Sequence, residues 1–498
     1  MKKIVKNWPE LLLLLIFSTG CSNDFLSENN KSAITQENYF TTAAQAQAAV
    51  AGIYPMLQSF TKEIEYRGDA PWSLLEMPVG HIGLGGSQYK EGSIKHTNSA
   101  NEPVYNVIWT DFYNGIANAN LAIKRIPAIN MNEVTKKRLL GEVYFLRALY
   151  YSYLVKLYGD ISLITEPINF SSPDLYPERS SKEKIYELII NDLKEAEKSG
   201  LPQVDETGRP SLGAVKSLLS GIYLTMAGYP LNKGTEFYQL AATKAKEVLD
   251  GNYYKLFDNY AYLHDRAHKN KQELIFQVQY LGSVKINRIT EFISPSGISK
   301  LTSDLGTVVP IKEFVSSYEL NDKRTQERQF YFTESFAKGS PTKIIKFTPS
   351  LYKFWLEEAA GQNGDGNSDQ NWTLLRLPEV MLIYAEALNE VKGPSDAYTQ
   401  INMIRKRANL APLLGLTKNE FREAVWRERY HELAFENKAY FDIQRTHKVY
   451  NLNTGRFEDA FSYINESGAR FNEQYMLWPV PQSEIDTNPK LLPQNSGW

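Results

Sequence analysis

The stretch from residue 371 to residue 448 constrains the fold more than any other, because it contains two paired helical segments in succession. In the first pair, apolar side chains recur at the three- and four-residue spacing of a helix, at Val380, Met381, Ile383, Tyr384, Ala387 and Leu388. Gly393 and Pro394 form a helix stop, and Ser395 can cap the helix that follows. The pattern predicts an αα-hairpin across residues 376–410.

A second paired unit, Thr417 to Arg445, follows directly. Two helical hairpins in succession indicate a repeat scaffold. Helical periodicity also occurs at residues 42–60, 104–126, 141–159, 181–198, 211–227 and 236–249. We therefore predict a mainly α fold whose helical repeats resemble tetratricopeptide units, although the strict 34-residue consensus of those units is not met.

Two regions lack this periodicity. Residues 66–102 are rich in glycine and form a loop insertion, and residues 253–371 are punctuated by Gly, Ser, Pro and Asn. Within the latter, Glu273–Tyr280 alternates apolar and polar residues, which predicts a short strand. The chain divides into an N-terminal helical region (38–252), a loop-rich middle subdomain with small strands (253–371), and a C-terminal helical-repeat region with a tail (372–498).

The N-terminus has the pattern of a secretion signal. Lysines are followed by the apolar run Leu11–Phe17, which is too short to cross a bilayer, and then by small residues before Cys21. By similarity to bacterial lipoproteins, residues 1–20 would be removed, Cys21 would carry lipid, and residues 21–37 would form a tether. Ser18 stands where such sites usually have an aliphatic residue. The alternative is an ordinary signal peptide that leaves an unpaired thiol.

The composition limits the partners. The chain has 55 basic and 57 acidic residues, so its charge gives no reason to expect nucleic acid or an anionic membrane as a ligand. Cys21 is the only cysteine, which excludes an intramolecular disulfide and a cysteine-based metal site. The 31 tyrosines and 8 tryptophans serve both core packing and flat contact surfaces for a neutral ligand. No later segment resembles a transmembrane helix, so we expect a soluble body outside the cytoplasm.

Catalytic motifs are incomplete. His431-Glu432 begins like a zinc-protease motif, but Phe435 occupies the place of the second histidine. Three glutamates lie on one helix face with three arginines available to neutralise them: Glu428, Glu432 and Glu436, with Arg405, Arg407 and Arg429. Paired carboxylates can serve as a glycosidase acid and base. The favoured interpretation is a structural network between stacked helices, since buried charges need partners.

Nucleotide and metal motifs are also incomplete. The glycines of residues 83–86 lack the spacing and the strand-to-helix context of a nucleotide-binding loop. Asp365, Asn367 and Asp369 imitate the first ligands of an EF-hand, but Gln370 replaces the turn glycine and Arg376 replaces the closing glutamate. We expect a solvated loop with no metal or other cofactor, and calcium near these three residues is the alternative.

Several phrases occur in the order found in one known family: FLRALYYSYLVKLYGD, YAEALNE, IRKRANL, ERYHELAFENKAYFDIQR and LWPVPQSEIDTNPKLLPQN. Across essentially its whole length, the chain resembles the SusD/RagB family. The resemblance implies a SusD-like fold, a lipid anchor in the outer membrane and exposure at the cell surface. It also implies a function without catalysis: capture of an oligosaccharide or polysaccharide and its delivery to a SusC-like TonB-dependent transporter.

Sugars stack their apolar faces on aromatic rings. Aromatic residues outside the repeat helices are therefore the candidate glycan-binding residues: Trp72, Tyr89, Phe292, Tyr352 and Trp355. Trp72 is the first choice, and for each residue the alternative role is packing in the core. Two other functions stay open, which are capture of a non-glycan nutrient such as peptides by the same mechanism, and glycan hydrolysis.

Overall fold

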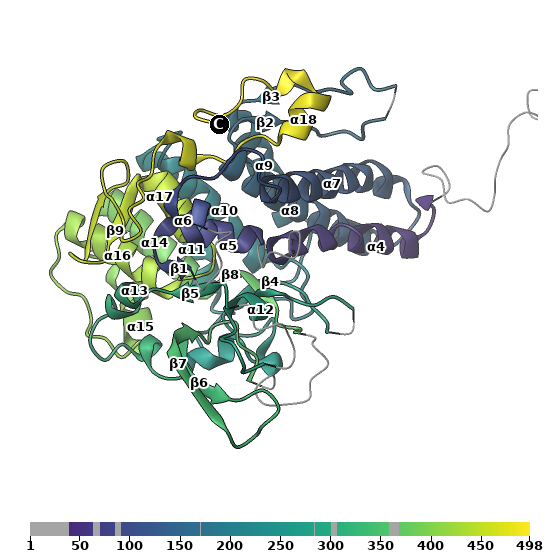
Figure 1. The fold of residues 1–498 in the computed structure, drawn as a ribbon. Coiled ribbons are helices and arrows are strands. Elements are labelled where there is room, and N and C mark those ends of the chain that lie inside the picture. The colour runs from purple at the N-terminus through teal and green to yellow at the C-terminus, as the bar shows by residue number, and fades with distance from the viewer. Residues whose placement is uncertain are drawn as a thin grey trace, which may run out of the picture.

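The computed structural model describes residues 39–62, 70–84, 91–169, 171–282, 284–299, 306–357 and 368–498 (Figure 1). Helices are the main regular elements of the fold, and the strands are few and short. The N-terminal half contains α4 (Ala43–Ala51), α5 (Pro71–Glu76), α6 (Glu91–Lys95), α7 (Val104–Arg125), α8 (Glu133–Tyr158), α9 (Lys182–Glu197), α10 (Leu212–Ala227) and α11 (Thr235–Gly251). The remainder contains α12 (Ile289–Ile293), α13 (Lys312–Ser316), α14 (Leu377–Lys392), α15 (Tyr398–Arg407), α16 (Lys418–Glu432), α17 (Ala439–Thr446) and α18 (Gln482–Thr487).

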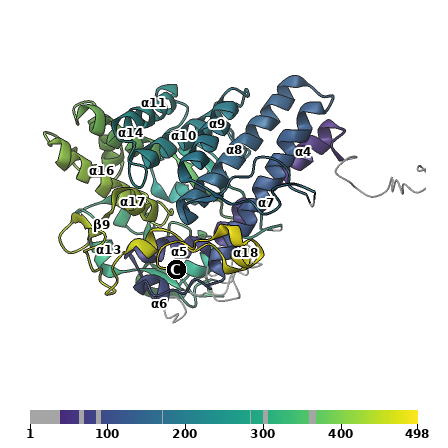
Figure 2. The ribbon, with the colours of Figure 1, turned by 90° about the horizontal axis from the view of Figure 1, so that it is seen from above.

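The long helices stack one upon the next. Helix α8 packs against α7 and α9, α10 packs against α9 and α11, and α14 packs against α11 and α16. Figure 2 shows these helices following one another along one side of the molecule, with the short elements on the other side. Helices α11 and α14 are neighbours although the whole middle region separates them in sequence. The predicted mainly α fold is confirmed, and the tetratricopeptide-like character of the repeat stays a prediction.

Both predicted C-terminal hairpins are present. Helix α14 begins at Leu377 and ends before Gly393, whose φ of +86° favours glycine. Helix α16 begins with a capping box in which the Thr417 hydroxyl accepts from the Glu420 backbone and the Glu420 carboxylate accepts from the Thr417 backbone. Three of the four hairpin boundaries lie within one residue of the prediction, and α15 ends at Arg407, three residues before the predicted end at residue 410.

Two helix predictions were wrong in detail. Ser395 does not cap α15, which begins after Ala397 without a side-chain cap. The helix predicted for residues 42–60 is divided into α4 and a 3-10 helix, η2 (Tyr54–Thr61). Pro55 lies in the first turn of η2 and has no backbone N–H to continue the hydrogen bonding of α4.

Small antiparallel sheets connect distant segments. The described residues form five two-stranded sheets: β1 (Ile82–Leu84) with β5 (Val308–Pro310), β2 (Ile161–Ser162) with β3 (Arg179–Ser180), β4 (Leu274–Val278) with β8 (Trp372–Arg376), β6 (Tyr331–Phe336) with β7 (Ile344–Leu351), and β9 (Lys448–Asn451) with β10 (Arg456–Asp459). Strand β4 confirms the strand predicted at residues 273–280. Strand β8 runs directly into α14, so the middle region is joined to the helical stack.

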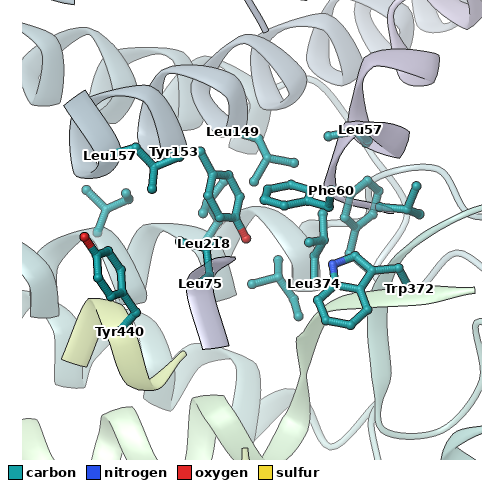
Figure 3. Close-up of a cluster of buried hydrophobic side chains, with 14 of the residues drawn as sticks. Leu57, Phe60, Leu75, Leu149, Tyr153, Leu157, Leu218, Trp372, Leu374 and Tyr440 are labelled. Carbon is teal, nitrogen blue, oxygen red and sulfur yellow. The ribbon is translucent and has the colours of Figure 1, made fainter. Parts of the chain in front are cut away.

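The hydrophobic core is continuous across the predicted regions. Figure 3 shows part of it, where Phe60 of η2, Tyr153 of α8 and Trp372 of β8 meet. A small satellite cluster lies beside β6 and β7 and contains Ile298, Phe332, Tyr352, Trp355 and Leu356. Among the described residues, we find no helix with the length and apolar character needed to span a bilayer.

Candidate ligand-binding site

Trp72, the first choice for a sugar platform, is fully buried, with 0% of its surface exposed. It lies on α5, a short helix inside the predicted loop insertion. Its indole Nε1 donates to the carbonyl of Phe435 at 3.0 Å, and its ring meets the edges of Phe354 and Trp372. Trp72 therefore closes the core between α5 and the C-terminal helices.

Three further candidate residues are buried in the same way as Trp72. Phe292 is buried on α12, and Tyr352 and Trp355 belong to the satellite cluster. A sugar stacks only on a ring that solvent reaches, so these rings and Trp72 do not form an exposed platform. The segments that carry them are short, and burying a large ring is what holds such a segment on the core. Tyr89 and Cys21 lie outside the described residues.

Of the three residues named as possible calcium ligands, the structure describes only Asp369. Asp369 accepts from Arg266 Nε at 2.6 Å and pairs with Lys269 Nζ at 3.4 Å, through different carboxylate oxygens. Asp365 and Asn367 lie outside the described residues. In the part of the chain that the structure describes, no three His, Cys, Asp or Glu side chains are grouped so that they could hold a metal ion.

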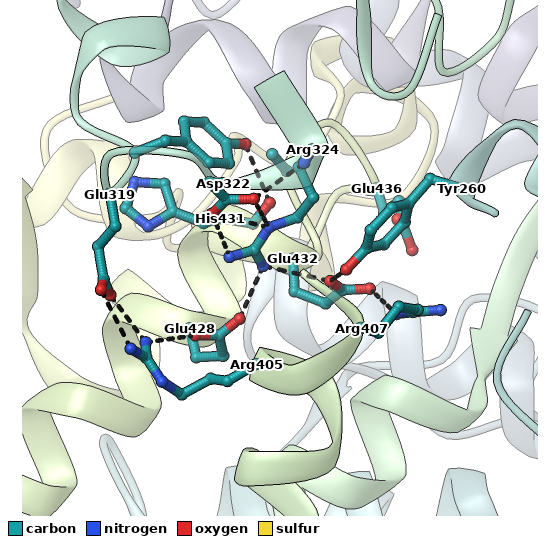
Figure 4. A network of polar contacts seen from close by, with 12 residues as sticks. Tyr260, Glu319, Asp322, Arg324, Arg405, Arg407, Glu428, His431, Glu432 and Glu436 are labelled. Carbon is teal, nitrogen blue, oxygen red and sulfur yellow. Dashed lines mark hydrogen bonds and ion pairs between the residues drawn. The ribbon is translucent and has the colours of Figure 1, made fainter. Parts of the chain in front are cut away.

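A buried charge network ties the C-terminal helices to the middle region (Figure 4). Glu432 accepts from Arg407 and Arg376 at 2.6 Å each and from Arg324 at 3.2 Å. Arg324 also donates to Glu428 at 2.7 Å. The network predicted from sequence is confirmed, with two additions: Arg324 and Arg376 come from the middle region and β8.

The predicted role of Arg429 was wrong, because it pairs with Asp442 at 3.0 Å instead of with the glutamates. Burial alone would raise the pKa of Glu432, but Arg407, Arg376 and Arg324 outweigh it and lower the pKa to about 2. Burial raises the pKa of Glu428, against the opposing charges of Arg324 and Arg405. Both carboxylates are shielded from solvent, so a glycosidic bond cannot reach them as an acid–base pair.

An open pocket of about 280 Å³ lies between η2, the turn at residues 207–209 and β4. This volume is close to the ~300–1,000 Å³ typical of small-ligand sites. The walls combine apolar, amide and hydroxyl groups with one arginine, and the lining residues are Ala51, Tyr54, Pro55, Leu57, Gln58, Thr207, Gly208, Arg209, Gln277, Val278 and Gln279. The pocket suits a small polar ligand with apolar faces.

Hydrogen bonds to neighbouring residues fix the polar side chains that line this pocket. Tyr54 Oη and Arg209 Nη1 both donate to Glu142 Oε2 at 2.7 Å. Burial raises the pKa of Glu142, and Tyr54 and Arg209 oppose that shift. On the opposite wall, Gln58 Nε2 donates to the carbonyl of Gln279 at 3.0 Å. These contacts fix the groups before any ligand arrives.

Amide side chains behind β4 complete the wall. Gln279 Nε2 donates to Asn270 Oδ1 at 2.9 Å, and Gln279 Oε1 accepts from Asn371 Nδ2 at 2.9 Å. Gln277 Nε2 donates to Thr373 of β8 at 2.8 Å. Sequence reasoning missed this pocket. The signal that could have found it is the pair Gln277 and Gln279, two amides at alternate positions of the strand predicted at residues 273–280, since amides shielded from solvent need partners.

An exposed aromatic ring is present in the middle region. Tyr262 is 39% exposed and stacks on His268 with 4.4 Å between ring centroids and 16° between planes. The His268 ring is fixed by a 2.9 Å contact from Nδ1 to the Asp265 carboxylate. His268 stacks on the ring, and Phe257 packs against it at a centroid distance of 6.0 Å. Tyr262 is the kind of platform that was expected at Trp72.

Two family models and a solved structure are similar to this chain. A family model described as the SusD family matches residues 317–498, and one described as starch-binding and associating with the outer membrane matches residues 24–224. The crystal structure of a SusD superfamily protein from Parabacteroides distasonis is 35% identical, with a TM-score of 0.87 over 94% of this chain and 100% of that one. The chain belongs to the SusD family. The SusD/RagB resemblance seen in the sequence is thereby confirmed.

Curated SusD relatives extend along the same length. SusD-like protein P2 of Formosa agariphila is 28% identical over 100% of both chains. The starch-binding protein SusD of Bacteroides thetaiotaomicron is 25% identical over 74% of both chains. The family model that matches residues 24–224 and this SusD relative are both described as starch-binding, and the family model also as associating with the outer membrane.

Proposed function

We propose that this SusD-family protein captures an oligosaccharide or polysaccharide and passes it to a SusC-like TonB-dependent transporter. The pocket between η2 and β4 is the observation that carries the proposal. Its size, its amide-rich wall and its apolar floor match a neutral sugar, whose hydroxyl edges need donors and acceptors and whose C–H faces need apolar contact. Its relatives' starch and glycan binding supports the same ligand class.

Tyr262 supplies a second contact of the right chemistry. Its exposed ring can stack on a sugar unit outside the pocket, as a chain longer than one or two units would require. The ligand would then be recognised by one pocket and one flat platform. The carboxylates of the charge network take no part, and we propose that binding involves no bond cleavage.

Isothermal titration calorimetry with a panel of oligosaccharides tests the site. Gln58→Ala removes a side chain from the pocket wall, and we expect a Kd about 5–10 times higher because a hydrogen bond contributes ~1 kcal/mol. Tyr262→Ala is expected to weaken binding of longer chains by a similar factor. The control is Tyr253→Ala, an exposed tyrosine outside the pocket lining.

Four outcomes separate the possibilities. Weakening in Gln58→Ala and Tyr262→Ala but not in the control supports the assigned site. Glycan binding that neither variant changes places the site elsewhere and leaves the glycan function standing. Heat of binding with peptides and with no glycan would replace the ligand class with another nutrient. Release of reducing ends from any polysaccharide would contradict binding without hydrolysis.

We further propose that Cys21 carries the lipid that anchors the chain at the outer-membrane surface. Cys21→Ser is expected to move the protein from the membrane fraction to the soluble fraction, and surface proteolysis of whole cells reports exposure. Co-purification from detergent extracts, followed by mass spectrometry, tests the partner. Recovery of a TonB-dependent barrel supports delivery to a transporter, and repeated recovery of the chain alone contradicts it.

A further inference from the structure

A second cavity, of about 70 Å³, lies between α8, α10, α14, α16 and α17. It is far too small for a sugar. A buried site needs about 10–15 Å³ for each water-sized occupant, so this cavity has room for a few atoms. Charged side chains from α8, α14, α16 and α17 line it, together with apolar and hydroxyl groups.

The charges around the cavity do not balance. Lys438 pairs with Glu379 at 2.8 Å, and Arg429 pairs with Asp442 at 3.0 Å. Arg445, also in the lining, pairs with Glu386 at 2.8 Å. These three cations therefore each have a carboxylate. The fourth cation of the lining, Lys156, has none within the part of the chain that the structure describes.

Lys156 is held between two aromatic rings. Its Nζ lies 4.4 Å from the centroid of Tyr153 and 4.2 Å from that of Phe441. Such contacts favour a cation but satisfy none of its three N–H donors. Burial lowers the pKa of Lys156 to about 7, and the nearby charge of Lys438 adds to this shift, while Glu379 and Asp442 oppose it. An anion beside Lys156 would favour its charged form.

Two further donors in the same lining are unsatisfied. Among the described residues, Arg429 Nη1 and Ser217 Oγ are buried without a hydrogen-bond partner. Two acceptors in the lining, Asn437 Oδ1 and Glu379 Oε2, also have no hydrogen bond from any described residue, although Glu379 Oε2 forms the 2.8 Å ion pair with Lys438. Leaving a buried donor unpaired costs about 1–3 kcal/mol, and more when it is charged. The ammonium of Lys156 and these two donors outnumber the two acceptors of the lining, which favours an occupant that accepts hydrogen bonds and carries negative charge.

We propose that this cavity binds a small monovalent anion of chloride size, held by Lys156 and Arg429 with the Ser217 hydroxyl donating to it. The anion would neutralise Lys156 and join α8 and α10 to α16. A neighbouring cavity of about 130 Å³ shares Lys156, Thr225, Phe441 and Arg445 with it and extends to the exposed Tyr229. This second cavity gives the ion a route from solvent.

Bromide identifies such a site directly, because its anomalous scattering distinguishes it from water. Crystals of the protein grown with sodium bromide are expected to show an anomalous peak between Lys156 and Arg429. Lys156→Met should remove the peak while the protein still folds, since an apolar side chain of similar length replaces an unpaired buried charge. An occupied cavity without anomalous signal would mean water alone and would overturn the proposal.

Thermal unfolding gives an independent measurement. At equal ionic strength, chloride is expected to raise the Tm of the wild type above its value in gluconate by about 1–2 °C, because a ligand that binds only the folded state stabilises it. Lys156→Met should lose this difference, and the surface variant Lys198→Met should keep it. A chloride effect of the same size in Lys156→Met, or none in the wild type, would contradict the anion site.

Discussion

Glu432 accepts hydrogen bonds from three arginines that reach it from different elements: Arg324, Arg376 and Arg407. None of these four side chains has more than a few per cent of its surface exposed. Buried ions of this kind are stable only as a complete set, because each charge offsets the desolvation of its neighbours. A substitution of Glu432 therefore removes a partner from all three arginines.

Glu432→Gln should lower the free energy of unfolding by about 3–5 kcal/mol, because Arg324, Arg376 and Arg407 each lose one of their buried carboxylate partners. Urea unfolding followed by circular dichroism measures the change. The control is Glu195→Gln, which breaks an exposed pair with Lys198 and should cost less than about 1 kcal/mol. If the two variants lost equal free energies of unfolding, the buried network would stabilise the fold no more than an exposed ion pair does.

The same residue predicts a pH dependence. The folded-state pKa of Glu432 is about 2, below the ordinary value of 4.5, so its contribution to stability is present above pH 4.5 and is lost as pH falls toward 2. The stability difference between the wild type and Glu432→Gln should therefore shrink by about 1 kcal/mol between pH 6 and pH 3.5. Urea unfolding at the two pH values measures it, and a constant difference would contradict this assignment.

Trp72 illustrates a ring whose role is structural. Trp72→Ala should reduce stability by about 3–5 kcal/mol, because it opens a cavity and leaves the Phe435 carbonyl without its donor. Tyr262→Ala, at an exposed ring, should change stability by less than about 1 kcal/mol. Thermal unfolding of both variants measures the contrast. A stable Trp72→Ala protein that lost glycan binding would restore Trp72 as a candidate binding residue.

At the scale of elements, the turn at residues 207–209 determines the shape of the candidate pocket. Gly208 has a φ of +89°, and a Cβ there would lie 2.3 Å from the side chain of Gln279. The turn therefore packs directly on the amide wall of β4. Only glycine permits both the backbone conformation and the close approach.

Gly208→Ala should destabilise the protein by about 2–4 kcal/mol, from backbone strain together with the clash. Gly200→Ala isolates the strain, since Gly200 has a φ of +78° with nothing within 4 Å of a new Cβ, and should cost about 1–2 kcal/mol. Urea unfolding of both proteins gives the difference. Equal costs would mean that Gln279 moves away freely and that the pocket wall is not rigid.

The helical hairpins were predictable because their signals are local. Periodic apolar residues, Gly393 and the capping box at Thr417 all act within a few residues. The burial of the loop aromatics Trp72, Phe292, Tyr352 and Trp355 could not be predicted in this way, because burial depends on distant partners. Trp72 donates to a carbonyl 363 positions away in the sequence. The candidate pocket was missed for the same reason, since η2, the turn at Gly208 and β4 meet only in the folded chain.

At the scale of the whole molecule, the middle region is built into the helical stack. The pairing of β4 with β8, the continuation of β8 into α14, and the buried contacts of Arg324 and Arg376 all connect the two. Loops can then differ among SusD-family members while the helices that support them stay in place. Ligand specificity would reside in the middle region and the turns beside it.

The most direct test of glycan capture is affinity electrophoresis of the purified protein through gels that contain single polysaccharides, beside a gel without polysaccharide. We predict retardation by at least one polysaccharide, relief of that retardation by oligosaccharides of the same sugar, and a smaller shift for Gln58→Ala than for the Tyr253→Ala control. Unchanged mobility in every polysaccharide, together with binding of a peptide ligand by calorimetry, would contradict the proposed function.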